Sequence, residues 1–535
     1  MSTAPPGTAP ATTPAVAVAK PLRIKTLTLT DFRAFPGPAP QAIEFGGKNM
    51  LVYGENGAGK SSVFYALSEL FSVKPTRSLR QHKNVFSGAP DTSCSVEVEF
   101  TDALKAARWE LVSPTLPGGS SGAHAGAHSR ERHPARTTGG ADMRVVQAAQ
   151  RRACLDYRSL LDTNYKHGDD AINLFEIAVN HLLSDFSVTV AGGLSQTIGD
   201  LWRAVEHAKP LKHTAGALAL INQACANFNA GFQEALSALH LVVATLLADL
   251  IGTEITFAPL AFGGVTYSAV RYKRDREIAG RVLKPDISFR SHPVATPQHF
   301  LNEARLSAMA LAIYLAGRLT CTPAVQSDAL KLLVLDDVLI GLDHANRLPV
   351  LDVLKKHFAT WQIVLLTHDR GWFDMARGWL DKDAWHCVEI FEGDESARAP
   401  MPVVRATANL PAKQYLAHAK QLLADHYVEA SANYARQAFE AALRGGCQHN
   451  NVPVAFQQNT KDVKAEFLLK AVEDWAKLDP ARKPRFEPVL KRLRLLRNVV
   501  LNPYSHPLAP NIPTTEVHGA IAEVEKLIDA FVGKP

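Results

Sequence analysis

The sequence predicts an α/β fold with a mixed sheet, a helical insertion and an all-α C-terminal domain. Near-continuous apolar runs at 331–335 and 362–366 are typical of central parallel strands that are covered on both faces. The alternation of apolar and polar residues at 24–29 and the short run at 49–53 predict further strands ahead of the insertion. After about residue 405 the composition changes to Ala-rich helical patterns without a strand signal, so we place a domain boundary there.

The chain is long enough for several domains and carries a mild positive charge. Its 535 residues include 58 Lys and Arg against 52 Asp and Glu, and this net charge of +6 permits nucleic-acid contact without requiring it. The six cysteines form no CxxC pair, so neither a zinc site nor a disulfide framework is predicted, and a reducing cytoplasm fits best. The N-terminal residues lack the basic and apolar regions of a signal peptide, and no membrane contact is predicted.

The pattern divides the chain into five segments. The first is a tail rich in Ala, Pro and Thr, which is predicted to be disordered. The others are a first head lobe, a helical arm with a β-hairpin, a second head lobe and a helical C-terminal domain. In chain order the five segments are residues 1–22, 23–143, 144–295, 296–405 and 406–535.

The first lobe combines short strands with one helix and one polar loop. Further strands and a helix are predicted at 41–45, 95–100, 109–112 and 61–71. Residues 113–142 are rich in Gly, Ser, His and Arg, which predicts a flexible loop. His124, His128 and His133 lack acidic or Cys partners at ligand spacing, so a solvated loop is favoured over a metal cluster.

The insertion is predicted to be mostly helical up to residue 251. Two short segments with strand character, 254–257 and 265–268, then predict a β-hairpin. The apolar helix at 232–251 packs either against its copy in a second subunit or within its own chain, and the sequence leaves both alternatives open.

Residues 54–62 form a phosphate-binding loop. They read GENGAGKSS, the GxxxxGK[ST] pattern, between a predicted strand and a predicted helix. Glycines let backbone N–H groups surround phosphate oxygens, and the helix N-terminus adds a positive dipole end. Lys60 is expected to reach the β- and γ-phosphates, and the Ser61 hydroxyl to bind Mg²⁺, so ATP and Mg²⁺ are the predicted cofactors. The predicted nucleotide-binding residues are Gly54, Asn56, Gly57, Gly59, Lys60, Ser61 and Ser62.

Two acids end the first central strand, which is the Walker B pattern. Asp336 is expected to hold Mg²⁺ together with Ser61, and Asp337 to orient or deprotonate an attacking water. The second central strand ends in Thr367 and His368, and the histidine is expected to face the γ-phosphate. Asp337 and His368 are therefore the predicted catalytic residues.

The order of these motifs resembles that of the ABC-ATPase superfamily. The opening IKTLTLTDFRAF is similar to the first strand of its RecF, Rad50 and SMC branch, and the resemblance covers roughly residues 23–112 and 295–395. It implies an ABC-type ATPase head, with a P-loop core and a helical insertion in a mixed sheet. It also assigns residues 341–343 to the family's D-loop, in which Asp343 is the expected contact.

The family's signature loop maps onto residues 301–307, LNEARLS, at the start of a helix predicted over 301–319. The resemblance implies that this loop completes the nucleotide site of a partner head, so ATP would clamp a homodimer. The expected contacts across the dimer are Asn302, Glu303 and Arg305. Asn302 stands where the family commonly has serine, and Asp337 where it has glutamate, which implies slow hydrolysis.

The C-terminal domain is predicted as a set of helices. Helices at 412–423 and 427–443 form a pair that Gly445 and Gly446 end. A helix at 486–501 places basic residues largely outside its apolar face, which indicates either a nucleic-acid or acidic-partner surface or an ordinary solvated face. These basic residues are Lys491, Arg492, Arg494 and Arg497.

The segment 497–506 resembles HEPN-like helical domains. Ribonuclease members of that group use an Arg and a His that lie closer together than Arg497 and His506 do. A docking role is therefore favoured over catalysis, with His506 fixing a turn.

The short arm and helical tail resemble the sensor-ATPase subunits of bacterial anti-phage systems such as Septu, PARIS and retron-associated ATPases. The phrases at 335–343 and 365–373, LDDVLIGLD and LLTHDRGWF, are similar to that group. The resemblance implies a homodimeric or larger cytoplasmic assembly that controls a separate effector, such as a nuclease. Two alternatives stay open: a RecF- or Rad50-like repair ATPase that clamps DNA, and a helical tail that is itself a ribonuclease.

Overall fold

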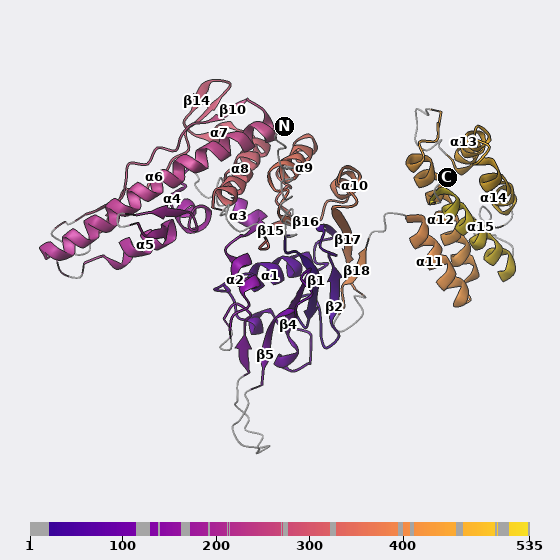
Figure 1. Cartoon of the computed structure of the whole chain (residues 1–535), viewed down its shortest axis with the longest axis horizontal. Coiled ribbons are helices and arrows are strands. Elements are labelled where there is room, and N and C mark those ends of the chain that lie inside the picture. Colours follow the sequence, from indigo (N-terminus) through magenta and orange to yellow (C-terminus); the bar gives the residue numbers. More distant parts are fainter. Residues whose placement is uncertain are drawn as a thin grey trace, which may run out of the picture. The chain divides into compact units, whose positions relative to one another are not determined.

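The computed structural model describes residues 21–113, 129–136, 140–161, 172–190, 193–210, 212, 214–268, 270, 276–321, 328–393, 400–406, 411–455, 464–497, 500 and 513–532. The chain divides into two compact units, Met1–Arg405 and Ala406–Pro535 (Figure 1). The first unit is α/β and the second is all-α, which confirms the predicted fold class. The finer division of the first unit into lobes and arm stays a prediction. The predicted tail lies outside the described residues except for its last two.

A six-stranded sheet forms the centre of the first unit. Its strand order is β18-β17-β3-β16-β15-β7. The strands are β18 (Val403–Ala406), β17 (Trp385–Phe391), β3 (Asn49–Gly54), β16 (Gln362–Thr367), β15 (Leu332–Asp336) and β7 (Arg152–Asp156). All neighbours from β17 to β7 pair in parallel, so these strands end at the same edge of the sheet. The predicted central strands are confirmed, whereas β7 lies in a segment that we predicted to be mostly helical.

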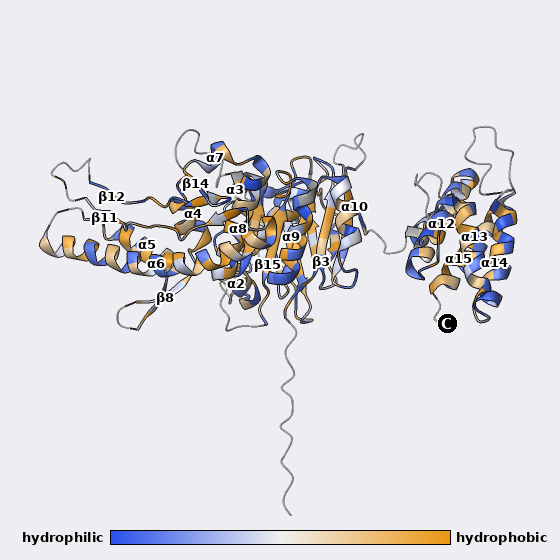
Figure 2. Cartoon of the chain, turned by 90° about the horizontal axis from the view of Figure 1, so that it is seen from above, coloured by the Kyte–Doolittle hydropathy of each residue, from blue (hydrophilic) through white to orange (hydrophobic). Residues whose placement is uncertain are grey.

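Both faces of this sheet are buried, and this explains its apolar strands. Leu333 and Leu335 of β15 belong to one hydrophobic cluster, and Leu332 and Val334 belong to the cluster on the other face. Figure 2 shows β3 and β15 in the hydrophobic colour. Since neither face contacts water, alternation is lost and the strands read as continuous apolar runs.

An antiparallel sheet and several short helices cover one face of the central sheet. Its order is β2-β1-β4-β5-β6, with β2 (Gln41–Glu44), β1 (Ile24–Thr30), β4 (Ser95–Phe100), β5 (Ala107–Val112) and β6 (Arg130–Arg132). Helix α1 (Lys60–Leu70) shares one hydrophobic cluster with both sheets. The neighbouring helices are η1 (Leu79–His82), η2 (Asp91–Ser93) and α2 (Met143–Ala149). The predicted strands and helix of this lobe are confirmed.

The described part of the segment 113–142, which we predicted to be a flexible loop, includes a residue that is buried in the head. His133 is buried, and its Nε2 lies 3.1 Å from the carbonyl oxygen of Glu69. The prediction of a solvated loop is therefore wrong for His133, because the imidazole packs edge-to-face against the ring of Trp109. No cluster of metal-ligating side chains occurs among the described residues, and His124 and His128 lie outside them.

The opposite face of the central sheet carries the remaining helices of the head (Figure 1). They are α3 (Tyr157–Leu161), α7 (Pro297–Phe300), α8 (Glu303–Cys321), α9 (His344–His357) and α10 (Arg370–Trp379). Helix α8 begins two residues later than predicted because Asn302 caps it: the side-chain Oδ1 accepts a hydrogen bond from the backbone N of Arg305 at 3.0 Å.

The arm is built on α6 (Ala215–Ile251), beside α5 (Ile198–His207). Its smaller elements are α4 (Phe175–Ile177), η3 (Ala178–Leu182), β8 (Ser187–Thr189) and β9 (Ser195–Thr197). Phe175, Trp202, Phe228 and Phe232 form an aromatic cluster between these elements. The apolar side of α6, Phe232 included, is thus buried within its own chain, which favours the second of the two alternatives for this helix.

Helix α6 is also the one helix of the described part that is long and apolar enough to cross a membrane, judged by length and composition alone. Its apolar side is buried in the hydrophobic cluster of its own unit, and such burial is equally typical of a core helix. The predicted absence of membrane contact stays a prediction.

The predicted β-hairpin at 254–268 is wrong. β10 (Ile255–Phe257) pairs with β13 (Ile287–Phe289), which continues to β14 (His292–Val294). β11 (Thr266–Tyr267) pairs instead with β12 (Ile278–Ala279). Local alternation identifies strands, but it does not select their partners, and here both strands pair with segments later in the chain.

The second unit contains five helices in its described part. They are α11 (Pro411–Ala424), α12 (Val428–His449), α13 (Ala465–Lys477), α14 (Lys483–Leu496) and α15 (Thr514–Val532). Helix α12 continues through Gly445 and Gly446, so the predicted end at these glycines is wrong. A β-carbon at Gly446 would lie 2.4 Å from the ring of Phe531, so the glycine allows α15 to pack closely against α12.

The basic residues of α14 and Arg497, which follows its last residue, are largely paired within the unit. Arg492 lies 3.2 Å from Glu523, Arg494 lies 2.8 Å from Glu473, and Arg497 lies 3.2 Å from Glu466. These pairs favour the ordinary charged face over a nucleic-acid surface. His506 lies outside the described residues, so the HEPN-like segment stays a prediction.

Candidate nucleotide-binding site

The carboxyl edge of the central sheet collects the chemical groups singled out in the sequence. β3 ends at Gly54, β16 ends at Thr367 and β15 ends at Asp336, and these strands are direct neighbours in parallel register. Ligand sites of parallel α/β sheets lie at this edge, because the loops that leave the strands converge there.

The backbone of the phosphate loop requires its glycines. Gly57 and Gly59 have φ values of 92° and 107°, a region that other residues rarely adopt. A β-carbon at Gly54 would lie 2.8 Å from the carbonyl oxygen of Ile390 on β17. The loop then enters α1 at Lys60, so the free N–H groups of the first helical turn face the loop.

Lys60 is buried and reaches back over the loop. Its Nζ donates to the carbonyl oxygens of Gly54 at 2.6 Å and Glu55 at 3.0 Å. Burial lowers the pKa of Lys60, and the carboxylates of Asp337 and Asp336 act in the opposite direction. The ammonium therefore lies between the loop and the acidic end of β15.

Ser61 and Asp336 meet across the edge of the sheet. The Ser61 hydroxyl donates to Asp336 Oδ2 at 3.4 Å, while Asp336 Oδ1 is buried without a hydrogen-bond partner in the described part of the chain. Burial, followed by the neighbouring Asp337, raises the pKa of Asp336 to about 6. A hydroxyl and a carboxylate are the hard oxygen ligands that Mg²⁺ prefers, so this pair fits that ion.

Asp337 adopts a left-handed backbone conformation, with φ of 53°. Its Oδ1 accepts a hydrogen bond from the backbone N of His368 at 2.9 Å and lies 3.0 Å from Nδ1 of the same residue. The imidazole nitrogen is close but is not aligned for a hydrogen bond. Strained conformations of this kind concentrate at functional sites, because neighbouring structure must hold them in place.

Asp156 is an acid of this edge that sequence reasoning missed. It ends β7 and is the register partner of Asp336 on β15. Its charge contributes to the raised pKa of Asp336, and its Oδ1 accepts hydrogen bonds from the backbone and hydroxyl of Ser159. The signal was present, since residues 153–156 read ACLD, an apolar run that ends in an acid.

Arg347 was also missed. It lies on α9 and is buried between residues 340–342 and the turn after β16, where it contacts Asp369. An arginine inside a helical pattern carries no sequence signal, because only the packing of α9 shows that it faces inward.

The expected signature residues lie at the start of α8 and differ in their surroundings. Asn302 and Glu303 are exposed, and the Asn302 amide nitrogen has no partner among the described residues. Arg305 is held within the chain: its Nη2 lies 2.7 Å from Glu254, and its guanidinium lies 5.0 Å from the ring centre of Phe289.

The D-loop residues pack against α8 and leave one acid exposed. A β-carbon at Gly341 would lie 2.4 Å from the Ser307 hydroxyl, so these two segments are in close contact. Asp343 precedes α9 and is exposed, and its carboxylate does not cap the helix.

Comparisons with known proteins agree with a P-loop site. Residues 26–115 match the family model described as AAA domain (AAA_23). The chain therefore contains an AAA-type P-loop nucleotide-binding domain. No curated protein matches the chain in sequence.

Three solved structures illustrate the similar folds. An Smc head domain with an extended coiled coil, bound to the C-terminal domain of ScpA and derived from Pyrococcus furiosus, is 12% identical, with a TM-score of 0.40 over 75% of this chain and 100% of that chain. The recombination mediator RecF with ATP is 13% identical, with a TM-score of 0.36 over 73% and 99%. The SMC head domain from Thermotoga maritima is 15% identical, with a TM-score of 0.32 over 72% and 99%.

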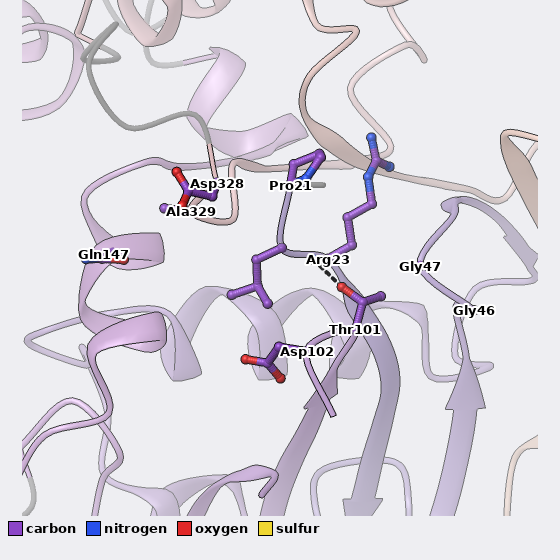
Figure 3. Close-up of a pocket in the computed structure, with 10 residues that line it drawn as sticks. Pro21, Arg23, Gly46, Gly47, Thr101, Asp102, Gln147, Asp328 and Ala329 are labelled. Carbon is purple, nitrogen blue, oxygen red and sulfur yellow. Dashed lines mark hydrogen bonds between the residues drawn. The ribbon is translucent and has the colours of Figure 1, made fainter. Parts of the chain in front are cut away.

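A cavity of about 870 Å³ lies elsewhere in the head (Figure 3). Gly46 and Gly47 precede β3 in its wall, and Asp328 and Ala329 precede β15. The cavity therefore lies at the amino ends of the strands, on the opposite edge from the phosphate loop. Among the residues that Figure 3 draws, the backbone N of Arg23 donates to Thr101 Oγ1 at 3.1 Å.

Proposed function

We propose that this chain binds and slowly hydrolyses Mg²⁺–ATP between two copies of its head, as the sensor or regulatory subunit of an anti-phage defence system that controls a separate effector, a nuclease. The observation that carries the ATPase part is the group of Lys60, Ser61, Asp336, Asp337 and His368 at one edge of the sheet.

The roles of these side chains follow from their chemistry. Lys60 pairs with the β- and γ-phosphates, and Ser61 and Asp336 would hold Mg²⁺, which neutralises charge on the phosphate oxygens when bound. Asp337 orients the attacking water, and His368 contacts the γ-phosphate. Asp156, which follows the strand beside Asp336, is expected to add negative charge near the ion.

Slow turnover follows from the surroundings of Asp337. Its Oδ1 already accepts a hydrogen bond from the backbone N of His368, so one carboxylate oxygen is engaged before any water is bound. The side chain is also one methylene shorter than a glutamate, so it reaches less far toward a bound phosphate.

Dimerisation around ATP is supported by the exposed groups of the α8 start and the D-loop. Among the described residues, the Asn302 side-chain nitrogen and the Asp343 carboxylate are exposed and have no hydrogen-bond partner, whereas Arg305 pairs with Glu254. We infer that they contact the nucleotide site of a second copy, as Glu303 and Arg305 would.

The ATP-binding part is tested with Lys60→Ala. Loss of charge-assisted bonds to two phosphates is expected to weaken ATP affinity by about 100-fold in isothermal titration calorimetry. Lys25→Ala is the matched control, because Lys25 is an exposed lysine of the same lobe that pairs with Glu99. Equal ATP affinity of the two variants would remove the basis of the proposed function.

The effector part is tested by co-expression with the products of neighbouring genes. We expect a nuclease to co-purify with the full chain and to change its activity with ATP, and we expect Lys60→Ala to abolish that dependence. A chain that protects no host from phage and holds no nuclease would contradict this part while leaving the ATPase intact.

A second candidate function, a clamp on nucleic acid, is favoured by one feature near α1. The guanidinium groups of Arg33 and Arg77 lie 4.2 and 5.9 Å from the ring centre of Tyr65. Neither forms an ion pair with a carboxylate within the described residues, and Arg77 contributes to the lowered pKa of Arg33, after burial. DNA binding that requires ATP and weakens steeply with salt would support this candidate.

A further inference from the structure

The strongest unassigned feature of the site is the buried side chain of Arg347. Its Nε donates to the carbonyl oxygen of Leu342 at 2.7 Å, and its Nη2 donates to that of Ile340 at 3.5 Å. Its Nη1 donates to Asp369 Oδ2 at 2.6 Å. One guanidinium therefore joins the segment before α9 to the turn after β16, and its side chain is 11% exposed.

Asp369 is itself fixed in position. Its Oδ1 caps α10 by accepting a hydrogen bond from the backbone N of Trp372 at 3.0 Å, and its own backbone N donates to Thr367 Oγ1 at 3.1 Å. His368 lies in sequence between Thr367 and Asp369, which this last bond joins, and its backbone N donates to Asp337. The contact between Arg347 and Asp369 thus bears directly on where His368 lies.

Arg347 also binds the backbone segment that precedes Asp343. Residues 338–342 are held by the buried side chains of Val338, Leu339 and Leu342 and by turns closed from Ile340 N to Asp337 O at 3.4 Å and from Leu342 N to Leu339 O at 3.1 Å. The two carbonyl oxygens that Arg347 binds lie in this segment, immediately before Asp343. A planar guanidinium can bind both carbonyls and a carboxylate at once, whereas an ammonium lacks this fork.

We propose that Arg347 is a positioning residue for ATP hydrolysis, which holds His368 and the segment before Asp343 in one arrangement without touching the nucleotide. This inference rests on the proposed ATPase function. It predicts that Arg347 contributes to the rate of hydrolysis and not to the binding of ATP. Within the described residues its guanidinium binds residues 340, 342 and 369 and forms no hydrogen bond with the phosphate loop or with the Ser61–Asp336 pair.

The test measures ATP hydrolysis and ATP affinity for the full chain, with Arg347→Ala and Arg347→Lys compared with the parent. We expect Arg347→Ala to lower kcat by about 10- to 100-fold, since misplaced groups lose near-attack geometry. We expect KM and the ATP dissociation constant to stay within about twofold. Arg347→Lys should recover part of kcat, because an ammonium can restore the bond to Asp369.

Arg144→Ala is the matched control. Arg144 is another largely buried arginine of the head, in the first turn of α2. Its guanidinium lies 3.1 Å from Asp102 and 2.6 Å from Asp142. We expect it to lower Tm about as much as Arg347→Ala does, with kcat unchanged. Equal kcat for Arg347→Ala and Arg144→Ala would overturn the positioning role.

A double variant tests the route through Asp369. Asp369→Asn retains Oδ1 for the cap of α10 but removes the charge that Arg347 binds. If Arg347 acts through this contact, the double variant with Arg347→Ala should be no slower than the single variant Arg347→Ala. Additive losses would overturn the route. A parent chain that hydrolyses no ATP would overturn the proposed function itself, whereas an active parent with a fully active Arg347→Ala overturns only this inference.

Discussion

The phosphate-binding edge and the start of α8 belong to the same head but are built in different ways. At the edge, Lys60, Ser61 and Asp336 face one another inside a single chain. At the start of α8, Asn302 and Glu303 face solvent, and Arg305 is held by Glu254. The first region is arranged by folding alone, whereas the second offers its groups outward.

This difference teaches where a second copy would matter. At the edge, Lys60 and Ser61 already have hydrogen-bond partners within one chain, so ATP binding should depend on one chain. The α8 start has an exposed amide and an ion-paired arginine, so its part in the site should depend on a second chain. The predictions below separate these two behaviours.

The largest effect is expected for Asp337→Asn. Removing the group that orients the attacking water should lower kcat by about 100-fold or more, while ATP affinity changes little. Trapped ATP should then hold two heads together, and size-exclusion chromatography with light scattering should show a dimer with ATP. A variant that stays monomeric with bound ATP would contradict the clamp.

Acidic pH should weaken Mg²⁺ binding at the phosphate-binding edge and leave the ion pair between Glu254 and Arg305 of α8 intact. The pKa of Asp336 is raised to about 6, so its carboxylate gains a proton as the pH falls from 7 to 5 and must lose it to bind Mg²⁺. We expect Mg²⁺ affinity of the nucleotide-bound chain to fall by about tenfold over this range.

Glu254, which precedes β10 and pairs with Arg305 of α8, behaves in the opposite way, because Arg290 and then Arg305 lower its pKa. Its ion pair should therefore survive at pH 5. The Mg²⁺ titration is corrected with free ATP at each pH, and an affinity independent of pH would contradict the raised pKa of Asp336.

Asn302→Asp should separate capping from contact with a second copy. The aspartate retains an oxygen to cap α8 but loses the amide donor and adds a negative charge. We expect unchanged Tm and unchanged ATP binding by the monomer, with ATP-dependent dimerisation weakened by about tenfold. Lower Tm with normal dimerisation would show that Asn302 is only a cap.

The smallest effect is expected for Glu254→Gln. Freeing Arg305 from its partner should let the guanidinium reach a second copy, so ATP-dependent dimerisation should strengthen by about two- to fivefold in analytical ultracentrifugation. Arg281→Gln is the control, because Arg281 pairs with Glu176 in the arm, away from α8. Weaker dimerisation in Glu254→Gln would indicate that the pair is needed in place.

Much of the site could be read from the sequence because its residues follow local rules. The glycines at 57 and 59 are required by positive φ, and the apolar runs of β15 and β16 are required by burial on both faces. The acids at 336 and 337 follow such a run directly. Each of these signals lies within a few residues, where backbone conformation and burial restrict the choice of side chain.

Other parts could not be read because they depend on distant packing. Asp156 becomes a neighbour of Asp336 only because β7 joins β15, and β10 pairs with β13 rather than with the nearest strand. In the sequence, Gly446 is typical of a helix end, whereas in the structure it leaves room inside α12 for the ring of Phe531 from α15.

The sequence by itself determined the phosphate loop, the central strands, the two acids of β15 and the change from α/β to all-α architecture. Backbone strain and burial leave a local record of these features in residue type and spacing. Only the tertiary structure decided that Arg347 joins residues 340–342 to Asp369 and that Glu254 holds Arg305. Such contacts join residues from separate elements, and a local pattern that fits one partner fits several others equally well.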